Sequence, residues 1–131
     1  GSASGIKKGY TAINYLGLVG RVIEVSAQTS KILLISDPGL GVSSIVQRSR
    51  QEGLVTGTLS SSLIMRYLPK DADIAIADTI VTSGLTANFP KGLIVGAVID
   101  TGEEFSGLSK YAIIKPAVNL SGLEEVLIII P

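Results

Sequence analysis

The chain has 131 residues, a formal net charge of zero, and neither histidine nor cysteine. This length suits one compact domain or two small ones that share a core, and a neutral charge gives no basis for binding nucleic acid. Without histidine, the chain lacks the commonest general base near neutral pH. Without cysteine, it has no thiolate that could act as a nucleophile or bind a metal. We therefore expect no catalytic residue, no cofactor and no metal site.

Short stretches of alternating or β-branched apolar residues recur along the chain, and no sustained helical period interrupts them. This pattern predicts an all-β protein of the sandwich or barrel type. Turn-forming residues separate the stretches, among them Asp37-Pro38-Gly39, Pro90-Lys91-Gly92 and Asp100-Thr101-Gly102. A single helical turn is expected at 120–124, where Ser121 and Glu124 could form a capping box. The ten predicted strands are 10–15, 18–25, 31–36, 43–48, 54–59, 63–68, 79–83, 93–100, 110–115 and 125–130.

Two of these strands resemble each other. The segment "GLVGRVIEV" at 17–25 matches "LIVGAVIDT" at 93–101, aligned on Val-Gly pairs that contain Gly20 and Gly96. A glycine weakens a strand interior unless the backbone must bulge, bend or pass close to another segment, and closing a small barrel requires such bends. We interpret both glycines as bending devices. The alternative is a chance match of two short segments.

The serines offer little support for hydrolysis. A triad that uses Ser60-Ser61-Ser62 would need a histidine base, which is absent. Ser4 and Lys7 have the spacing of a serine–lysine dyad, but they lie at the chain start without the further motif that such enzymes carry.

The charged residues also allow ordinary interpretations. Asp71 and Asp73 suit a solvated turn better than a calcium loop, which needs a third ligand in register. Arg48 and Arg50, two apart on one predicted strand, would project from one face and suit either an anionic partner or a solvated sheet face. The six aromatic side chains are scattered, and we expect most of them to pack in the core or at hinges: Tyr10, Tyr15, Tyr67, Phe89, Phe105 and Tyr111.

The segments "GLVGRVIEV", "RYLPKDADI" and "VTSGL" with "FPKGL" together resemble the extracytoplasmic region of the rod shape-determining protein MreC family. The similarity runs from about residue 5 to residue 131. It implies two small β-barrels in a chymotrypsin-like arrangement without catalysis, located outside the cytoplasm. The family's membrane helix and coiled coil are absent from this sequence, so any membrane attachment would come through a segment outside it. Thr86-Ala87-Asn88 stands where relatives often have a glycine-bearing turn, so the turn type at 86–88 stays open.

The resemblance also implies partners, namely a penicillin-binding transpeptidase, MreD and the MreB-associated elongation complex. We expect a non-catalytic scaffold that maintains rod cell shape by binding peptidoglycan-synthesis proteins. Candidate protein contacts are Tyr67, Leu85 and Phe89, although core packing also suits each of them. Two alternatives stay open. A serine hydrolase with a noncanonical base is one, and a polysaccharide-binding module, which predicts a concave surface lined with Tyr or Asn, is the other.

Strand counting suggests how the chain divides. Residues 1–4 are expected to be a tag or linker that precedes an excised fragment. Residues 5–39 and 119–131 would form a first, incomplete barrel, and residues 40–118 a second barrel of six strands. An incomplete barrel exposes unpaired backbone groups at its edge, so self-association is expected.

Overall fold

The computed structural model describes residues 1–86 and 89–131. The predicted turn at 86–88 falls largely outside the described residues, because Ala87 and Asn88 are not among them. No helix in the described ranges has the length and apolarity to cross a bilayer. Two short 3-10 turns are present, η1 (Ser2–Ser4) and η2 (Phe105–Gly107). The ten strands are β1 (Thr11–Asn14), β2 (Gly17–Val25), β3 (Ser30–Leu34), β4 (Val42–Val46), β5 (Glu52–Gly57), β6 (Leu63–Pro69), β7 (Thr79–Thr82), β8 (Ile94–Glu104), β9 (Ser109–Pro116) and β10 (Leu127–Ile129).

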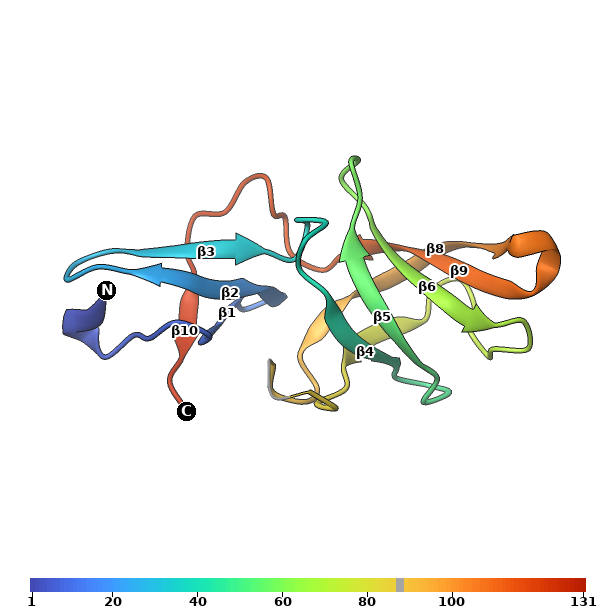
Figure 1. The fold of residues 1–131 in the computed structure, drawn as a ribbon, viewed down its shortest axis with the longest axis horizontal. Helices are drawn as coiled ribbons and strands as arrows, with labels where there is room; N and C mark the ends of the chain where they lie inside the picture. Colours follow the sequence, from blue (N-terminus) through green and yellow to red (C-terminus); the bar gives the residue numbers. More distant parts are fainter. Residues whose placement is uncertain (87–88) are drawn as a thin grey trace.

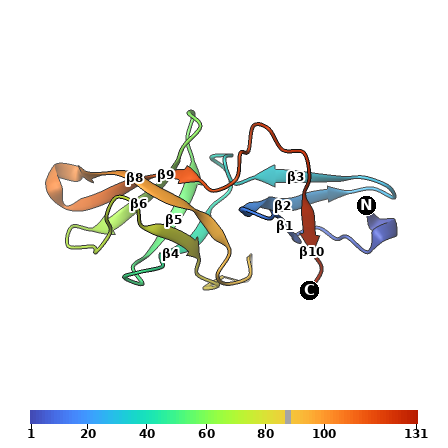
Figure 2. The same ribbon diagram turned by 180° about the vertical axis from the view of Figure 1, so that it is seen from behind.

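The strands form two units that lie side by side (Figure 1). One is a four-stranded sheet in the order β10-β1-β2-β3, and the other is a closed barrel in the order β4-β5-β6-β9-β8-β7. The view from behind in Figure 2 shows both chain ends beside the sheet, with the N-terminus at the end of the sheet away from the barrel. The all-β class is therefore confirmed, with one closed barrel and an open four-stranded sheet where the incomplete barrel was predicted.

The chain leaves the sheet after β3 and returns to it after β9. On its return β10 pairs antiparallel with β1, placing Ile129 opposite Thr11. The proposed division into two domains stays a prediction, because buried side chains cross between the sheet and the barrel. Leu18 and Ile35, which belong to the sheet and its exit, lie in the same core cluster as the barrel residues.

Strand β2 faces two cores at once. Side chains alternate across a strand, so Leu18 enters the barrel cluster while Val19 enters a smaller cluster with Ala12 and Val118. Both Leu18 and Val19 are fully buried. This strand needs apolar side chains on both faces, which explains the nearly continuous apolar run in its sequence.

The two matching glycines have the same structural role. A Cβ at Gly20 would overlap the carbonyl oxygen of Leu33 on β3, and a Cβ at Gly96 would overlap the carbonyl oxygen of Lys115 on β9. Each glycine therefore lets a neighbouring strand approach more closely than a side chain would permit. Register shifts occur nearby, between Val22 and Glu24 and between Val98 and Asp100.

Two local predictions are wrong. Asp100-Thr101-Gly102 is not a turn, because β8 continues to Glu104 and pairs along this stretch with β9. The cross-strand partner of Gly102 is Tyr111, whose ring lies against it, so pairing with a long neighbouring strand overrides the local turn signal. The helical turn at 120–124 does not form either, since the Ser121 hydroxyl donates to Asn119 Oδ1 at 3.0 Å instead of capping a helix.

The first residues contact the sheet. The Ser2 amide donates to the Ser26 carbonyl at 2.7 Å, and the Ala3 amide donates to the Ala27 carbonyl at 3.1 Å. Residues 1–4, expected to be a tag or linker, thus bond to the connection between β2 and β3.

We predict that Gly20→Ala and Gly96→Ala each lower the free energy of unfolding by about 3 kcal/mol, because the added methyl group must displace a neighbouring strand. Gly39→Ala is the matched control. The nearest atom to a Cβ there is a side-chain oxygen of Asp37, at 3.1 Å. Urea denaturation of the three variants measures the difference, and equal stability of all three would contradict the close-approach role.

Candidate protein-binding surface

The structure does not bring the three predicted contact residues together. Tyr67 is 69% exposed near the end of β6, and Leu85 is 64% exposed in the connection from β7 to β8. Phe89, in the same connection as Leu85, is only 5% exposed and packs in the barrel core. β6 ends beside the β8–β9 hairpin, at the end of the barrel away from the sheet (Figure 1).

A β-bulge turns Tyr67 outward. Strict alternation from Leu63 and Met65 would place Tyr67 in the core. The register between β6 and β9 shifts after Met65, however, so that Leu68 becomes the next buried residue. The extra residue in β6 exposes the tyrosine ring, as bulges commonly do where they redirect a side chain.

Phe105, one of the six aromatic residues of which most were expected to be packed, stacks on Tyr67. Their ring centroids lie 6.1 Å apart with an interplanar angle of 9°. Phe105 is 59% exposed, and Leu108 beside it is also exposed. We call Tyr67, Phe105 and Leu108 the hairpin-end surface. The aromatic residue in the Phe105-Ser106-Gly107 turn would have indicated this surface, but the turn was predicted at 100–102 instead.

Uncommon backbone conformations hold these rings in place. The φ angles are 58° at Tyr67, 51° at Phe105 and 57° at Ser106. Positive φ is an outlier for bulky residues, and such strain concentrates at functional sites. Three such residues at one end of the barrel therefore mark the hairpin-end surface as a candidate binding site.

An ion pair lies beside the stacked rings. Arg66 donates from Nε at 2.9 Å and from Nη2 at 2.6 Å to the same Glu104 oxygen, Oε1. The hydrogen bond to Glu104 is the main cause that raises the pKa of Arg66. The Arg66 guanidinium lies 5.9 Å from the centroid of the Tyr67 ring, within the range of a cation–π contact. This pair connects β6 to the hairpin and so supports both aromatic side chains.

Arg48 and Arg50 do not share a strand face, because β4 ends at Val46 and both arginines lie in the connection after it. Arg48 donates two hydrogen bonds to Asp73, at 2.7 and 3.0 Å, and two to Asp78, both at 2.9 Å. The guanidinium is thus committed to the protein's own carboxylates rather than available to an anionic partner.

The same hydrogen bonds from Arg48 lower the pKa values of Asp73 and Asp78. For Asp78, a further bond from the Ala75 amide, at 2.9 Å, acts in the same direction. The cluster ties the connection after β4 to the segment between β6 and β7.

No group of three or more acidic side chains suited to a metal ion occurs within residues 1–86 and 89–131. The hydroxyl groups of Thr58, Ser60 and Ser62 bond one another in the connection between β5 and β6. The hydroxyl groups of Ser60 and Ser62 are therefore engaged in hydrogen bonds within this connection.

Comparison with known proteins gives a match to the family model "Rod shape-determining protein MreC, barrel core" over residues 1–130. The cell shape-determining protein MreC of Cereibacter sphaeroides is 37% identical over 75% of this chain and 33% of its own length. That of Listeria monocytogenes is 31% identical over 98% of this chain and 45% of its own length. The chain therefore spans less than half the length of these relatives.

Solved structures similar to this chain are also structures of MreC. The crystal structure of MreC from Pseudomonas aeruginosa has a TM-score of 0.88 and 28% identity, covering 99% of this chain and 84% of that one. Two more distant structures share the fold. One is a complex between penicillin-binding protein PBP2 and MreC from Helicobacter pylori, with a TM-score of 0.72 and 20% identity, covering 88% of this chain and 73% of that one. The other is a major periplasmic domain of MreC, with a TM-score of 0.74 and 22% identity, covering 90% of this chain and 74% of that one.

The matched relatives are named as cell shape-determining proteins. The chain belongs to the rod shape-determining protein MreC family.

We predict that Arg48→Met lowers the free energy of unfolding at neutral pH. The difference in unfolding free energy between the variant and the unchanged chain should shrink as the pH falls below 3.8, the ordinary pKa of both aspartates. A lowered pKa stabilises the folded state above the unfolded-state value, and this contribution is lost as the folded-state groups become protonated. Urea denaturation across the acid range measures it, with Arg50→Met as the control. A difference independent of pH would contradict the prediction.

Proposed function

We propose that this chain is a non-catalytic scaffold of the bacterial cell-elongation machinery, which maintains rod cell shape by binding peptidoglycan-synthesis proteins. Family membership supports this role, and the distant Helicobacter pylori relative was solved in complex with a penicillin-binding protein. The proposed partners are a penicillin-binding transpeptidase, MreD and the MreB-associated complex. The proposed location is extracytoplasmic, in line with the relative described as a periplasmic domain.

The observation that carries the proposal is the hairpin-end surface. Tyrosine is enriched among the residues that dominate binding energy at protein interfaces. Tyr67 and Phe105 are stacked and held by a constrained backbone, so little side-chain freedom is lost when a partner covers them. A preorganised aromatic pair is therefore a suitable anchor for the transpeptidase.

Leu85 provides a second, separate contact in this proposal. Its side chain is exposed, whereas the buried Phe89 would act by supporting the connection that carries Leu85. The two surfaces can be distinguished, because Tyr67 lies on β6 and Leu85 lies in the connection from β7 to β8.

We predict that Tyr67→Ala and Phe105→Ala each weaken binding to the purified penicillin-binding transpeptidase of the same organism by about tenfold or more. Both side chains are exposed, so circular dichroism should show the fold retained. Surface plasmon resonance measures the affinity, with Tyr15→Ala as a matched control on an exposed tyrosine elsewhere and Leu85→Ala as the test of the second surface. Unchanged affinity in Tyr67→Ala, Phe105→Ala and Leu85→Ala would remove the proposed surfaces.

Self-association through the incomplete barrel is also part of the proposal. The sheet ends at β3 on one side and at β10 on the other. Edge strands recruit further strands unless charges discourage them. β3 carries Lys31, whereas β10 consists of Leu127, Ile128 and Ile129 without a charge. β10 is therefore the edge better suited to pairing with a second copy.

We predict concentration-dependent dimers in light scattering, and a shift toward monomers in Leu127→Lys, which adds a charge to the β10 edge at an exposed side chain. Monomers alone at high concentration would contradict pairing through β10, and so would equal dimerisation of Leu127→Lys and the unchanged chain.

A further inference from the structure

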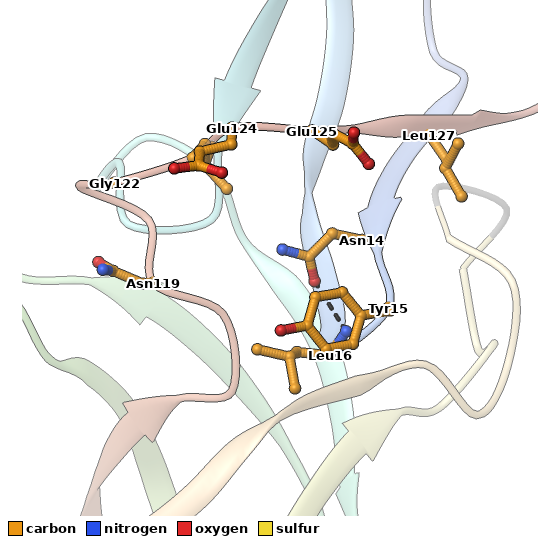
Figure 3. A pocket seen from close by; sticks show the side chains of 9 residues that line it. Asn14, Tyr15, Leu16, Asn119, Gly122, Glu124, Glu125 and Leu127 are labelled. Carbon is orange, nitrogen blue, oxygen red and sulfur yellow. Dashed lines mark hydrogen bonds between the residues drawn. The ribbon is translucent and has the colours of Figure 1, made fainter.

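A cavity of about 310 Å³ lies between the β1–β2 turn and the segment that leads into β10. Its volume is at the lower end of the range of small-molecule sites, about 300–1,000 Å³. Figure 3 shows side chains from both segments around one space. Those that the argument uses are Asn14, Tyr15, Asn119, Glu124 and Glu125.

Local hydrogen bonds orient both amide side chains of the cavity. The Leu16 amide donates to Asn14 Oδ1 at 2.8 Å, and the Ser121 hydroxyl donates to Asn119 Oδ1 at 3.0 Å. Each carbonyl oxygen is thereby engaged, which leaves each NH₂ group as the end available for donation. In Figure 3, the Asn14 nitrogen and the Tyr15 hydroxyl point toward the same space.

The cavity has acceptors and a negative charge. Glu124 and Glu125 line it, and no lysine or arginine is among its lining residues. Within the part of the chain that the structure describes, neither glutamate forms an ion pair. Two carboxylates without a basic neighbour accept hydrogen bonds from hydroxyl or ammonium groups and repel anions.

Tyr15 supplies an apolar face. It lies at the β1–β2 turn and is 92% exposed, so its ring is open to a ligand. The hydroxyl adds a polar group at the ring edge. An exposed tyrosine with the Asn14 amide donor and two carboxylates combines a stacking surface with both kinds of hydrogen-bonding group.

We infer that this cavity binds a sugar unit that is neutral or carries an amine. The C–H face of a pyranose ring would lie on Tyr15, its hydroxyl groups would donate to Glu124 and Glu125, and its oxygens would accept from the Asn14 amide. An amine substituent would gain from the negative charge and from the Tyr15 ring. The same carboxylates disfavour acidic sugars. The cavity has the Tyr and Asn lining expected of a polysaccharide-binding module, and it lies apart from the hairpin-end surface.

Titration of the ¹⁵N-labelled chain with three trisaccharides tests the inference: tri-N-acetylchitotriose, its deacetylated glucosamine trimer, and trigalacturonic acid. We expect saturable amide shifts at 14–16 and 119–125 with at least one of the first two, and none with the acidic trimer. Tyr15→Ala should weaken binding of either trimer by about tenfold, and the isosteric Asn14→Asp, which keeps the acceptor for Leu16 but removes the amide donor, should weaken binding of the neutral tri-N-acetylchitotriose by a similar factor. Tyr67→Ala should bind as the unchanged chain does.

Three results would overturn the inference. They are the absence of saturable shifts with both chitotriose probes, equal binding of the acidic trimer, and undiminished binding by both Tyr15→Ala and Asn14→Asp. Because these variants leave the hairpin-end surface intact, their transpeptidase affinity stays a separate measurement.

Discussion

Strand β2 joins the two halves of this structure, because consecutive side chains on it enter two different cores. Leu18 packs with the barrel residues, and Val19 packs with Ala12 and Val118 in the smaller cluster. Ile35, just past β3, also enters the barrel cluster, so the sheet cannot turn away from the barrel without exposing buried apolar groups. The shared core fixes how the sheet and the barrel lie relative to each other, and with them the two candidate binding regions (Figure 1).

Both candidate regions arise where regular strand pairing is interrupted. The hairpin-end surface depends on the bulge that turns Tyr67 outward and on the β8–β9 connection that presents Phe105. The cavity lies where the chain returns from the barrel to β10, beside the turn that carries Tyr15. A rigid β framework with exposed aromatic side chains at its irregular points suits a protein that works by contact.

Much of this fold could be predicted from the sequence. All ten strands form near their expected positions, because alternation and β-branched residues report burial directly. The Gly20 and Gly96 match also proved informative, since both glycines permit close strand approach. Long-range pairing was harder to predict. The turn signal at 100–102 gives way to the β8–β9 ladder, and Arg48 finds Asp73 and Asp78, which are 25 and 30 residues away in sequence. The outward position of Tyr67 depends on a one-residue register shift that no local pattern encodes.

Calorimetric unfolding tests the shared core most directly. If Leu18 and Ile35 unite the sheet and the barrel, the chain unfolds in one transition whose calorimetric enthalpy equals its van't Hoff enthalpy. Two resolved transitions, with the sheet melting while the barrel stays folded, would contradict the account.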